Sequence, residues 1–183
     1  RPNAKKPFFL SLELSSGAYG ARATKDGMNA IRYGGGNAGH VPIEADEMEN
    51  PLLFERYEIV PDTGGAGKYR GGNGFCRVYR VLADQASICL CADRDRSQPQ
   101  GLFGGKPGTT ARYILDPGTP KERRLPSKTP YIALDPGTLV WLQSAGGGGY
   151  GEPSARDPKL IERDLRDGYI TPEFARREYG WKG

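Results

Sequence analysis

The stretch from Val60 to Phe75, V-P-D-T-G-G-A-G-K-Y-R-G-G-N-G-F, places a carboxylate, a hydroxyl and two basic side chains among six glycines. Glycine permits positive φ and close backbone approach, so this density predicts a loop that folds tightly against a ligand, a partner or another loop. Successive N–H groups in such a turn can form an anion-binding nest. A surface turn between two strands is the alternative. The candidate residues for an anion or substrate loop are Asp62, Thr63, Gly64, Gly65, Lys68 and Arg70.

Three further residues, Asn37, His40 and Glu44, are weaker candidates for lining the same site. A metal site needs several converging His, Cys or carboxylate ligands, and His40 is the single histidine of the chain. We therefore expect no metal site within this chain, unless carboxylates or another chain complete a site at His40. The acidic residues between 44 and 49 could supply a base, although a solvated helix face explains them equally well.

Known catalytic and nucleotide-binding motifs are missing. The run G-A-G-K-Y-R-G-G lacks the order of a phosphate-binding P-loop, because Tyr69 follows Lys68 where that loop has Ser or Thr. Dinucleotide-binding glycine spacing and the G-x-S-x-G nucleophile elbow are absent as well. The residues alone therefore indicate loops suited to an anion or a neighbouring subunit, without a complete catalytic set.

Composition favours a turn-rich β protein. The 183 residues suffice for one domain with a small appendage, and the 27 glycines and 15 prolines alternate with apolar, β-favouring runs. Charges of both signs are interspersed at a net +4, so we expect no nucleic-acid partner. No run approaches transmembrane length, so no membrane association is expected. The odd number of cysteines fits a reducing cytoplasm, and we expect Cys89 and Cys91 to share a strand face as small buried hydrophobes.

The body of the chain reads as short strands joined by turns. The tripeptide A-D-Q separates the β-favouring runs 76–82 and 86–92 and predicts a hairpin between them. Two Asp-Pro-Gly turns suggest a meander or barrel-like sheet. Pro42 at a first helical position, followed by acidic residues, predicts a short helix. The expected strands are residues 7–14, 52–60, 76–82, 86–92 and 139–143, and the expected helix is 42–49.

The C-terminal tail changes character. Asp157-Pro158 and Thr171-Pro172 are helix start signals, and Gly168 and Gly180 are the matching stop signals. Helices this short are marginal alone, so we expect both to dock on the β body or on a partner. The predicted fold is mainly β, of the α+β class, with a glycine-rich β body at residues 1–153 and a helical tail at 154–183.

Several motifs follow one another along nearly the whole chain. They are G-A-R-A-T-K-D-G-M-N-A, G-N-A-G-H-V-P-I-E-A-D-E, E-I-V-P-D-T-G-G-A-G-K-Y-R-G-G-N-G-F, A-D-R-D-R-S-Q-P-Q-G-L-F-G-G-K-P-G, L-P-S-K, G-G-G-G-Y-G-E-P-S-A-R-D-P and D-G-Y-I-T-P-E-F-A-R-R-E-Y-G. In this order they resemble the C-terminal third of the hydantoinase B/oxoprolinase family. That family includes subunits of N-methylhydantoinases, 5-oxoprolinase, caprolactamases and the acetone and acetophenone carboxylases.

The resemblance implies an ATP-dependent cyclic-amide hydrolase of hydantoinase, oxoprolinase or lactamase type. A hydantoinase A-like partner would bind ATP and phosphorylate the small-molecule substrate, and the B-type subunit would complete the reaction with a divalent metal such as Zn or Mn. The family's His/Asp metal motifs lie in the N-terminal part of the subunit, beyond the segment that this chain resembles. We therefore expect that part and the A-like subunit to be required partners.

Some features depart from the family, and alternatives stay open. Thr63 stands where serine is usual, Ala38-Gly39-His40 replaces a more usual Asn/Thr-containing run, and the chain begins with Arg1, so we expect it to belong to a longer polypeptide. An ATP-dependent ketone carboxylase is one alternative, and a non-catalytic assembly module is another. An RNA-binding β domain is a third, which would require salt-dependent binding sensitive to Tyr69 and Arg70.

Overall fold

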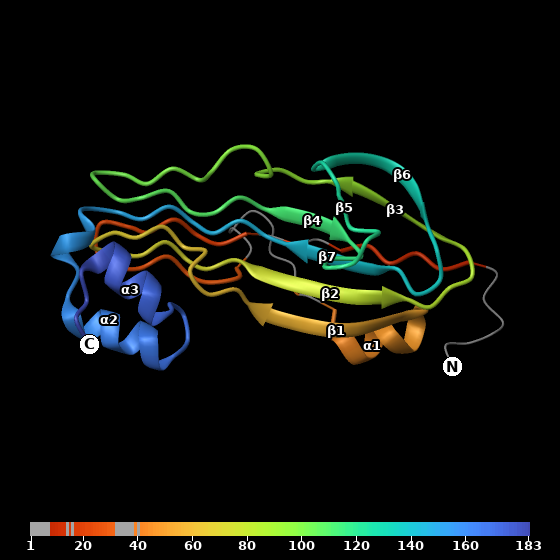
Figure 1. Cartoon of the computed structure of the whole chain (residues 1–183), viewed down its shortest axis with the longest axis horizontal. Helices are drawn as coiled ribbons and strands as arrows, with labels where there is room; N and C mark the ends of the chain where they lie inside the picture. Colours follow the sequence, from red (N-terminus) through yellow and green to blue (C-terminus); the bar gives the residue numbers. More distant parts are fainter. Residues whose placement is uncertain (1–7, 14, 16, 32–38, 40) are drawn as a thin grey trace.

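The computed structural model describes residues 8–13, 15, 17–31, 39 and 41–183. The molecule is elongated, with helices α2 (Pro158–Arg166) and α3 (Pro172–Tyr179) at one end and α1 (Ile43–Glu49) toward the other (Figure 1). In the described part, no helix is both long enough and apolar enough to cross a bilayer.

An antiparallel five-stranded sheet forms the centre, in the order β1-β2-β7-β4-β5. Strand β2 has buried residues at six of its seven positions, as expected for a strand that is paired on both edges and covered on both faces. The predicted strands at 52–60, 76–82 and 139–143 are confirmed within a residue at each end. The strand bounds are β1 Leu52–Ile59, β2 Phe75–Val81, β4 Arg112–Leu115, β5 Arg123–Arg124 and β7 Leu139–Gln143.

A separate two-stranded sheet pairs β3 (Ala86–Cys91) with β6 (Lys128–Leu134). The predicted hairpin between β2 and β3 is therefore wrong. Both edges of β2 are already occupied, by β1 and β7, so β3 has no edge to join and pairs elsewhere. The large sheet stays open, with β1 and β5 as its outer strands, so the mainly β fold is confirmed but the barrel-like closure is not formed.

The main core lies between the two sheets. Inner-face residues of β1, β2 and β7 meet residues of β4 and β6, and the half-buried Ile88 and Leu90 of β3 pack against them. Cys76 is fully buried, whereas Cys89 and Cys91 are exposed, so the prediction that they are buried is wrong. Because residues alternate across a strand, Ile88 and Leu90 take the inner face and the two cysteines face outward. The buried core residues are Leu52, Tyr79, Val81, Leu115, Leu125, Leu134 and Val140.

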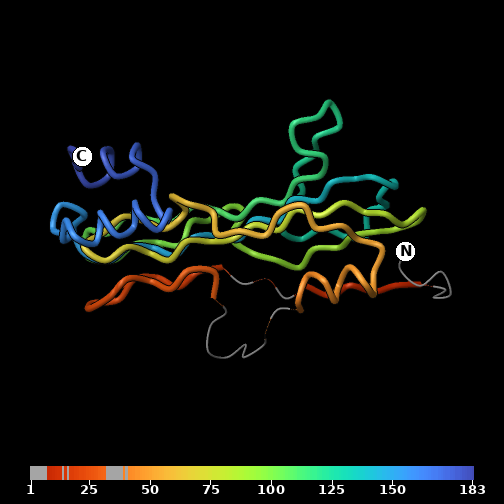
Figure 2. Tube along the Cα trace, turned by 90° about the horizontal axis from the view of Figure 1, so that it is seen from below, coloured from red at the N-terminus to blue at the C-terminus, as the bar shows by residue number. Residues whose placement is uncertain are grey.

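The N-terminal segment and α1 form a separate layer on one face of the sheet, and the turn between β4 and β5 projects from the other (Figure 2). Residues 8–13 belong to none of the assigned strands, and the ends of the predicted strand, Pro7 and Leu14, lie outside the described residues. The predicted helix at 42–49 is confirmed as α1, with Pro42 at its N-cap. Both Asp-Pro-Gly turns are also confirmed, with Gly118 at φ +73° and Gly137 at φ +86°.

The two tail helices are confirmed with their predicted caps. Asp157 and Thr171 accept hydrogen bonds from backbone N–H groups of the first turns, and Gly180 ends α3 in the left-handed conformation at φ +66°. The helices form a second apolar cluster that includes Ala66 of the central loop, so they dock on the β body as expected. The division of the chain at residue 153 stays a prediction. The cluster residues are Ala66, Ile161, Ile170, Phe174 and Ala175.

Candidate functional site

The central loop lies within a bundle of extended, glycine-rich segments that continues the sheet toward α2 and α3 (Figure 1). We call the segments 17–21, 63–74, 99–109 and 145–151 the glycine bundle. Backbone hydrogen bonds join them directly, for example from Gly65 N to Gly147 O at 2.8 Å and from Gly147 N to Gly72 O at 2.9 Å.

Segment 145–151 bonds to all three other segments of the bundle. Gly148 O accepts from Ala21 N, Gly149 N donates to Lys106 O, and Gly147 bonds to the central loop. A pleated strand has hydrogen-bonding groups in one plane and therefore only two neighbours. Bonding in more directions is expected of extended chains with three residues per turn, of the polyproline II type.

Close packing explains why successive residues of this segment are glycine. A Cβ atom added to Gly146 would lie 1.8 Å from Thr63 O, and one added to Gly147 would lie 2.0 Å from Tyr19 O. At Gly148 it would lie 2.0 Å from Gln100 O, so each residue faces a different neighbouring segment. No side chain fits between these backbones.

The candidate glycines of the central loop serve the same packing. Neither Gly64 nor Gly65 adopts the left-handed conformation, and a Cβ atom on either would lie 2.1 Å from a backbone oxygen. Gly64 N donates to Asn73 Oδ1 at 2.9 Å. The buried Thr63 hydroxyl donates to Val60 O and accepts from Gly74 N. The N–H groups of Gly64, Gly65, Gly71 and Gly74 thus have partners inside the bundle, and an anion-binding role stays a prediction.

Asp62 connects the central loop to α3. Its carboxylate accepts from the backbone N of Thr171 at 2.8 Å and from the hydroxyl of Thr171 at 2.7 Å. The same hydroxyl caps α3 by accepting from Phe174 N at 3.1 Å. Asp62 itself has φ +61°, a conformation in which Asp is tolerated better than most residues.

We expect Thr171→Ala to lower the free energy of unfolding by about 1–2 kcal/mol. The change removes a helix cap, which is worth about 1 kcal/mol, and one donor to Asp62. Thr171→Ser keeps both interactions and should stay close to the wild type. Urea denaturation of the three proteins measures the difference, and equal stability of the Ala and Ser variants would contradict the capping role.

Arg70 lies in a buried ion-pair network and does not face solvent. Its side chain is 2% exposed, and Nε donates to Asp164 Oδ2 at 3.0 Å. Nη1 donates to Gly71 O at 2.7 Å and to Asn29 Oδ1 at 3.3 Å. The guanidinium also lies 5.5 Å from the ring centre of Tyr169. Arg70 therefore binds α2 to the glycine bundle.

Arg156, Asp26 and the half-buried Arg163 also belong to this network, which sequence reasoning missed. Arg163 Nη2 lies 3.0 Å from Asp26 Oδ2 and 3.3 Å from Asp164 Oδ1. Arg156 donates to both carboxylate oxygens of Asp26, at 2.8 and 2.9 Å, and to Asp164 Oδ2 at 2.6 Å. Burial acts to raise the pKa of Asp26, but the hydrogen bonds and charge of Arg156 outweigh it and hold that pKa below its ordinary value. Three of the five residues fall in the family-like motifs: Asp26 in K-D-G, Arg70 in K-Y-R-G-G and Arg156 in S-A-R-D-P.

The remaining candidates do not gather at one place in the described structure. Lys68 is exposed, with its Nζ 5.6 Å from the ring centre of Tyr69. Glu44 is exposed in the first turn of α1, in the layer below the sheet. Asn37 and His40 lie outside the described residues. As ligand-binding residues, all four stay predictions.

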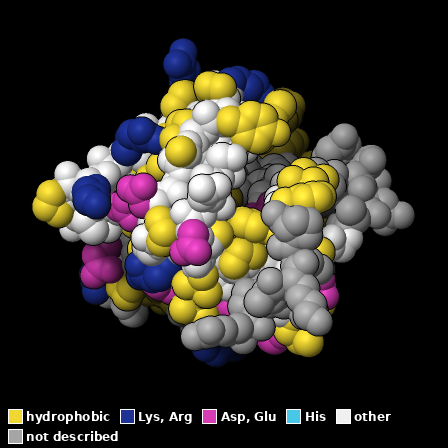
Figure 3. Space-filling model, turned by 90° about the vertical axis from the view of Figure 1, so that its right-hand side faces the viewer, with side chains coloured by type: hydrophobic (Ala, Val, Ile, Leu, Met, Phe, Trp, Pro, Cys, Tyr) yellow, Lys and Arg dark blue, Asp and Glu magenta, His cyan; other side chains and the backbone are white. Residues whose placement is uncertain are grey.

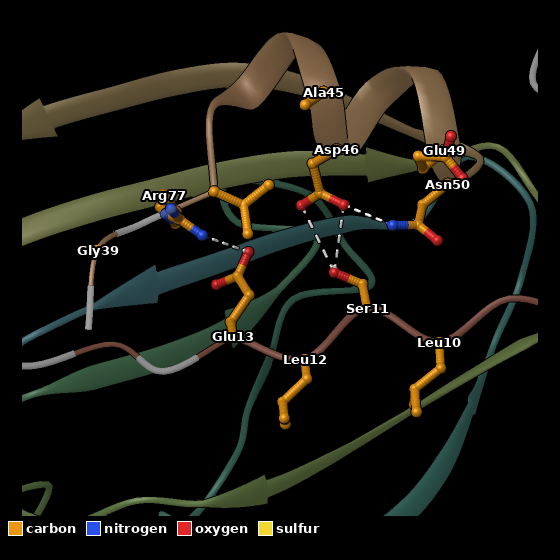
Figure 4. A pocket seen from close by; sticks show the side chains of 11 residues that line it. Leu10, Ser11, Leu12, Glu13, Gly39, Ala45, Asp46, Glu49, Asn50 and Arg77 are labelled. Carbon is orange, nitrogen blue, oxygen red and sulfur yellow. Dashed lines mark hydrogen bonds and ion pairs between the residues drawn. The ribbon is translucent and has the colours of Figure 1, made fainter. Parts of the chain in front are cut away.

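A pocket of about 320 Å³ lies between the N-terminal segment and α1 (Figure 4). Its charged lining residues are Glu13, Asp46, Glu49 and Arg77. Arg77 Nη1 lies 2.8 Å from Glu13 Oε1, and Asp46 accepts from Asn50 Nδ2 at 2.6 Å. Burial raises the pKa of Glu13, Arg77 opposes that shift, and the negative charge of Asp46 adds to it.

We expect Glu13→Gln to stabilise the chain at pH 7 and to have little effect below the ordinary Glu pKa of 4.5. Because the folded-state pKa of Glu13 is raised, its ionisation costs stability as pH rises from 4.5 toward the folded value, and the cost persists above it. Glutamine removes that ionisation and still offers Arg77 an acceptor. Thermal unfolding of both proteins at pH 4 and pH 7 tests this. A wild type that is more stable than Glu13→Gln at pH 7 would contradict the prediction.

The described residues do not fit a metal centre. They contain no group of three or more His, Cys, Asp or Glu side chains placed to hold one ion. The pocket near α1 has its carboxylates beside Arg77, whose positive charge disfavours a cation at Glu13.

The fold and the glycine bundle define this chain as a mainly β segment. Two solved structures of larger proteins contain the same architecture. A nucleotide-free acetone carboxylase superposes with a TM-score of 0.76 at 24% identity, over 92% of this chain and 27% of that chain. An ATP-dependent caprolactamase from Pseudomonas jessenii superposes with a TM-score of 0.75 at 26% identity, over 90% of this chain and 29% of that chain.

The chain belongs to the hydantoinase B/oxoprolinase family, whose sequence profile matches residues 1–153. A Pseudomonas protein (strain NS671), provisionally described as the B-type subunit of a D-/L-hydantoinase, is 37% identical over 94% of this chain and 29% of its own length. The acetophenone carboxylase delta subunit of Aromatoleum aromaticum is 32% identical over 93% of this chain and 29% of its own length. The chain thus spans less than a third of these relatives.

Proposed function

We propose that this chain forms the C-terminal part of the B-type subunit of a cytoplasmic, ATP-dependent cyclic-amide hydrolase. The observation that carries the proposal is the family match over residues 1–153, together with 37% identity to a protein described as the B-type subunit of a hydantoinase. The beta subunit of the caprolactamase of Pseudomonas jessenii, 28% identical over 98% of this chain, supports an amide substrate. ATP would bind to a hydantoinase A-like partner, and a divalent metal such as Zn or Mn would bind to the preceding part of the subunit.

In this proposal the chain contributes a rigid backbone. Backbone hydrogen bonds join the segments of the glycine bundle to one another, and the Arg70–Asp164 pair fixes α2 against it. Such a platform can hold a neighbouring active cavity in a fixed shape without supplying a nucleophile or a base. Lys68, the exposed basic residue of the central loop, is then the candidate that can reach an anionic group of the substrate.

The test is to purify the protein from its source and measure the intact masses of all polypeptides in the preparation. The assembled material is then assayed for ATP-dependent ring opening of hydantoin, 5-oxoproline and caprolactam. We expect turnover that requires ATP and a divalent metal. Turnover by the 183-residue chain unaided would contradict the proposal.

A ketone carboxylase is the second candidate, favoured by the 32% identity to the acetophenone carboxylase delta subunit over 93% of this chain. Bicarbonate-dependent carboxylation of acetone or acetophenone by the same material, without ring opening, would select it. The third candidate is an assembly module, favoured because Asp62 and Arg70 find their partners within the chain. An assembled complex that keeps full turnover when Lys68 is replaced would favour this third candidate.

We expect Lys68→Ala to lower kcat/KM of the assembled enzyme by about tenfold or more, since a lost charged hydrogen bond is worth about 1.5–3 kcal/mol. The melting temperature should not change, because the side chain is exposed. Lys121→Ala, an exposed lysine in the turn before β5, is the matched control and should leave kcat/KM unaltered. Equal kcat/KM for both variants would remove Lys68 from the site.

A further inference from the structure

A tight turn in segment 99–109 carries two apolar side chains at the end of the molecule where α2 and α3 lie (Figure 1). Gly105 N donates to Leu102 O at 3.0 Å, and the two residues between them have φ +52° at Phe103 and φ +91° at Gly104. A turn with positive φ at both central positions is of type I′, for which Asn-Gly is the usual pair. This chain has Phe-Gly there instead.

Phe103 suits this turn poorly, and the described residues do not cover its ring. A positive φ is strained for a bulky side chain, and Phe103 is 75% exposed. Its ring centre lies 5.0 Å from that of Tyr150, a contact that offsets part of the strain. Leu102 beside it is 58% exposed. Because backbone strain of this kind collects at functional sites, a contact with a further polypeptide segment explains the exposed ring better than packing within this chain.

The glycine bundle supports this turn rigidly. Leu102 N donates to Gly149 O at 2.9 Å, and Gly151 N donates to Leu102 O at 2.9 Å. Lys68 N donates to Gly151 O at 3.1 Å, so the turn and the exposed Lys68 lie one segment apart at the same end of the bundle. Hydrophobic side chains also gather at the opposite end of the molecule (Figure 3), but part of that surface belongs to residues outside the described ranges.

We propose that Leu102 and Phe103 dock into an apolar pocket of the rest of the B-type subunit, with the Phe103 ring inserted as an anchor. Aromatic side chains are enriched in interfaces, and a rigid support limits the entropy lost on docking. The curated relatives extend far beyond the matched segment, which is 29% of their length, so they contain ample polypeptide to form the pocket. The turn also lies beside Lys68, which the proposed function directs toward the active cavity of that same part. The inference rests on the proposed function.

The test replaces Phe103 with the photoreactive phenylalanine analogue p-benzoylphenylalanine in the full-length, assembled enzyme. Irradiation should cross-link position 103 to peptides of the B-type subunit outside residues 1–183, identified by mass spectrometry. The same analogue at Tyr131, which is 78% exposed on β6, is the control and should not label those peptides. Cross-links from position 103 to the ATP-binding subunit alone, to a second copy alone, or to nothing would overturn the docking proposal. ATP-dependent ring opening that persists alongside any of these outcomes would leave the proposed function standing.

Phe103→Asn provides a second measurement, in which the sign of the effect decides. Asparagine suits a type I′ turn, so without a docked ring the assembled variant should melt at or above the wild-type temperature. With the ring docked it should melt below that temperature, and further below it than Tyr150→Leu, which removes the ring pair and keeps the turn. Hydroxyl radicals should also oxidise Phe103 about fivefold or more slowly in the assembled enzyme than in a free peptide of residues 99–109, because a docked ring excludes water. A higher melting temperature for Phe103→Asn, or equal oxidation rates, would contradict the docking.

Discussion

Replacing Asp164 with alanine should lower the free energy of unfolding by about 3–5 kcal/mol, the cost of removing one partner from a buried ion pair. Asp164 is fully buried and accepts from Arg70 Nε at 3.0 Å and from Arg156 Nη2 at 2.6 Å. Alanine would leave the buried Arg70 guanidinium without a carboxylate partner, whereas Arg156 would keep its pair with Asp26. Helix α2 would then lose its ion pair with the glycine bundle, while the Asp62–Thr171 hydrogen bonds of α3 would remain. Urea denaturation followed by circular dichroism measures the loss.

Asp93→Asn is the control for this prediction. Asp93 also pairs with a basic residue, Lys128 at 3.1 Å, but its side chain is 84% exposed. Exposed pairs are worth about 0–1 kcal/mol, so the control should stay within that range. If Asp164→Ala were as mild as Asp93→Asn, the network would not hold the tail in place.

Low pH should weaken the same network. The folded-state pKa of Asp26 is held below its ordinary value of 3.8, so its contribution is complete above that value and is lost as pH falls through the folded pKa. The acid transition of the wild type should therefore be steeper below pH 3.8 than that of Asp26→Asn.

Local signals in the sequence were sufficient for the elements whose ends are defined by short-range chemistry. The Thr171-Pro172 start and the Gly180 stop predict α3, because a cap, a fixed φ and a left-handed residue are each properties of one or two positions. The strands that became β1 and β7 were predicted for a similar reason, since β-favouring runs end at clear turn residues.

Pairing between distant segments could not be predicted in the same way. Asp26 and Arg156 lie 130 residues apart, and neither stands in a pattern that indicates its partner. The strand β3 was assigned to a hairpin because its neighbour in sequence is β2, whereas the occupied edges of β2 are a property of the whole sheet. The exposure of Cys89 and Cys91 follows from that same pairing.

The glycines of the central loop correctly predict that backbones approach closely there. They do not predict whether a ligand or another segment of the chain lies against the loop. Glycine density indicates that something lies against the chain, without indicating what. For Gly64 and Gly65 the neighbours are other segments of the bundle, including Gly71 O and Lys106 O. A run of four consecutive glycines at 146–149 was the signal for that packing, since a strand in a sheet needs small residues on one face only.

Gly147→Ala should destabilise the chain by about 3 kcal/mol or more, at the upper end of the range for overpacked sites. The added Cβ atom would lie 2.0 Å from Tyr19 O, 2.4 Å from Tyr19 C and 2.8 Å from Gly20 N. All three are backbone atoms, so no side chain can rotate away. Relief requires segment 17–21 to move and the hydrogen bond from Gly72 N to Tyr19 O to break or lengthen.

Gly20→Ala is the matched control, because it introduces the same methyl group into the same bundle. Its Cβ atom would meet one atom within 4 Å, Gly148 O at 3.6 Å, which is an ordinary van der Waals distance. Neither glycine has a positive φ, so the two variants differ in packing alone. Thermal unfolding should separate them widely, with Gly20→Ala near the wild type. Equal melting temperatures would show that the segments can part without cost, and a bundle that parts so easily could not act as the rigid platform proposed for this subunit.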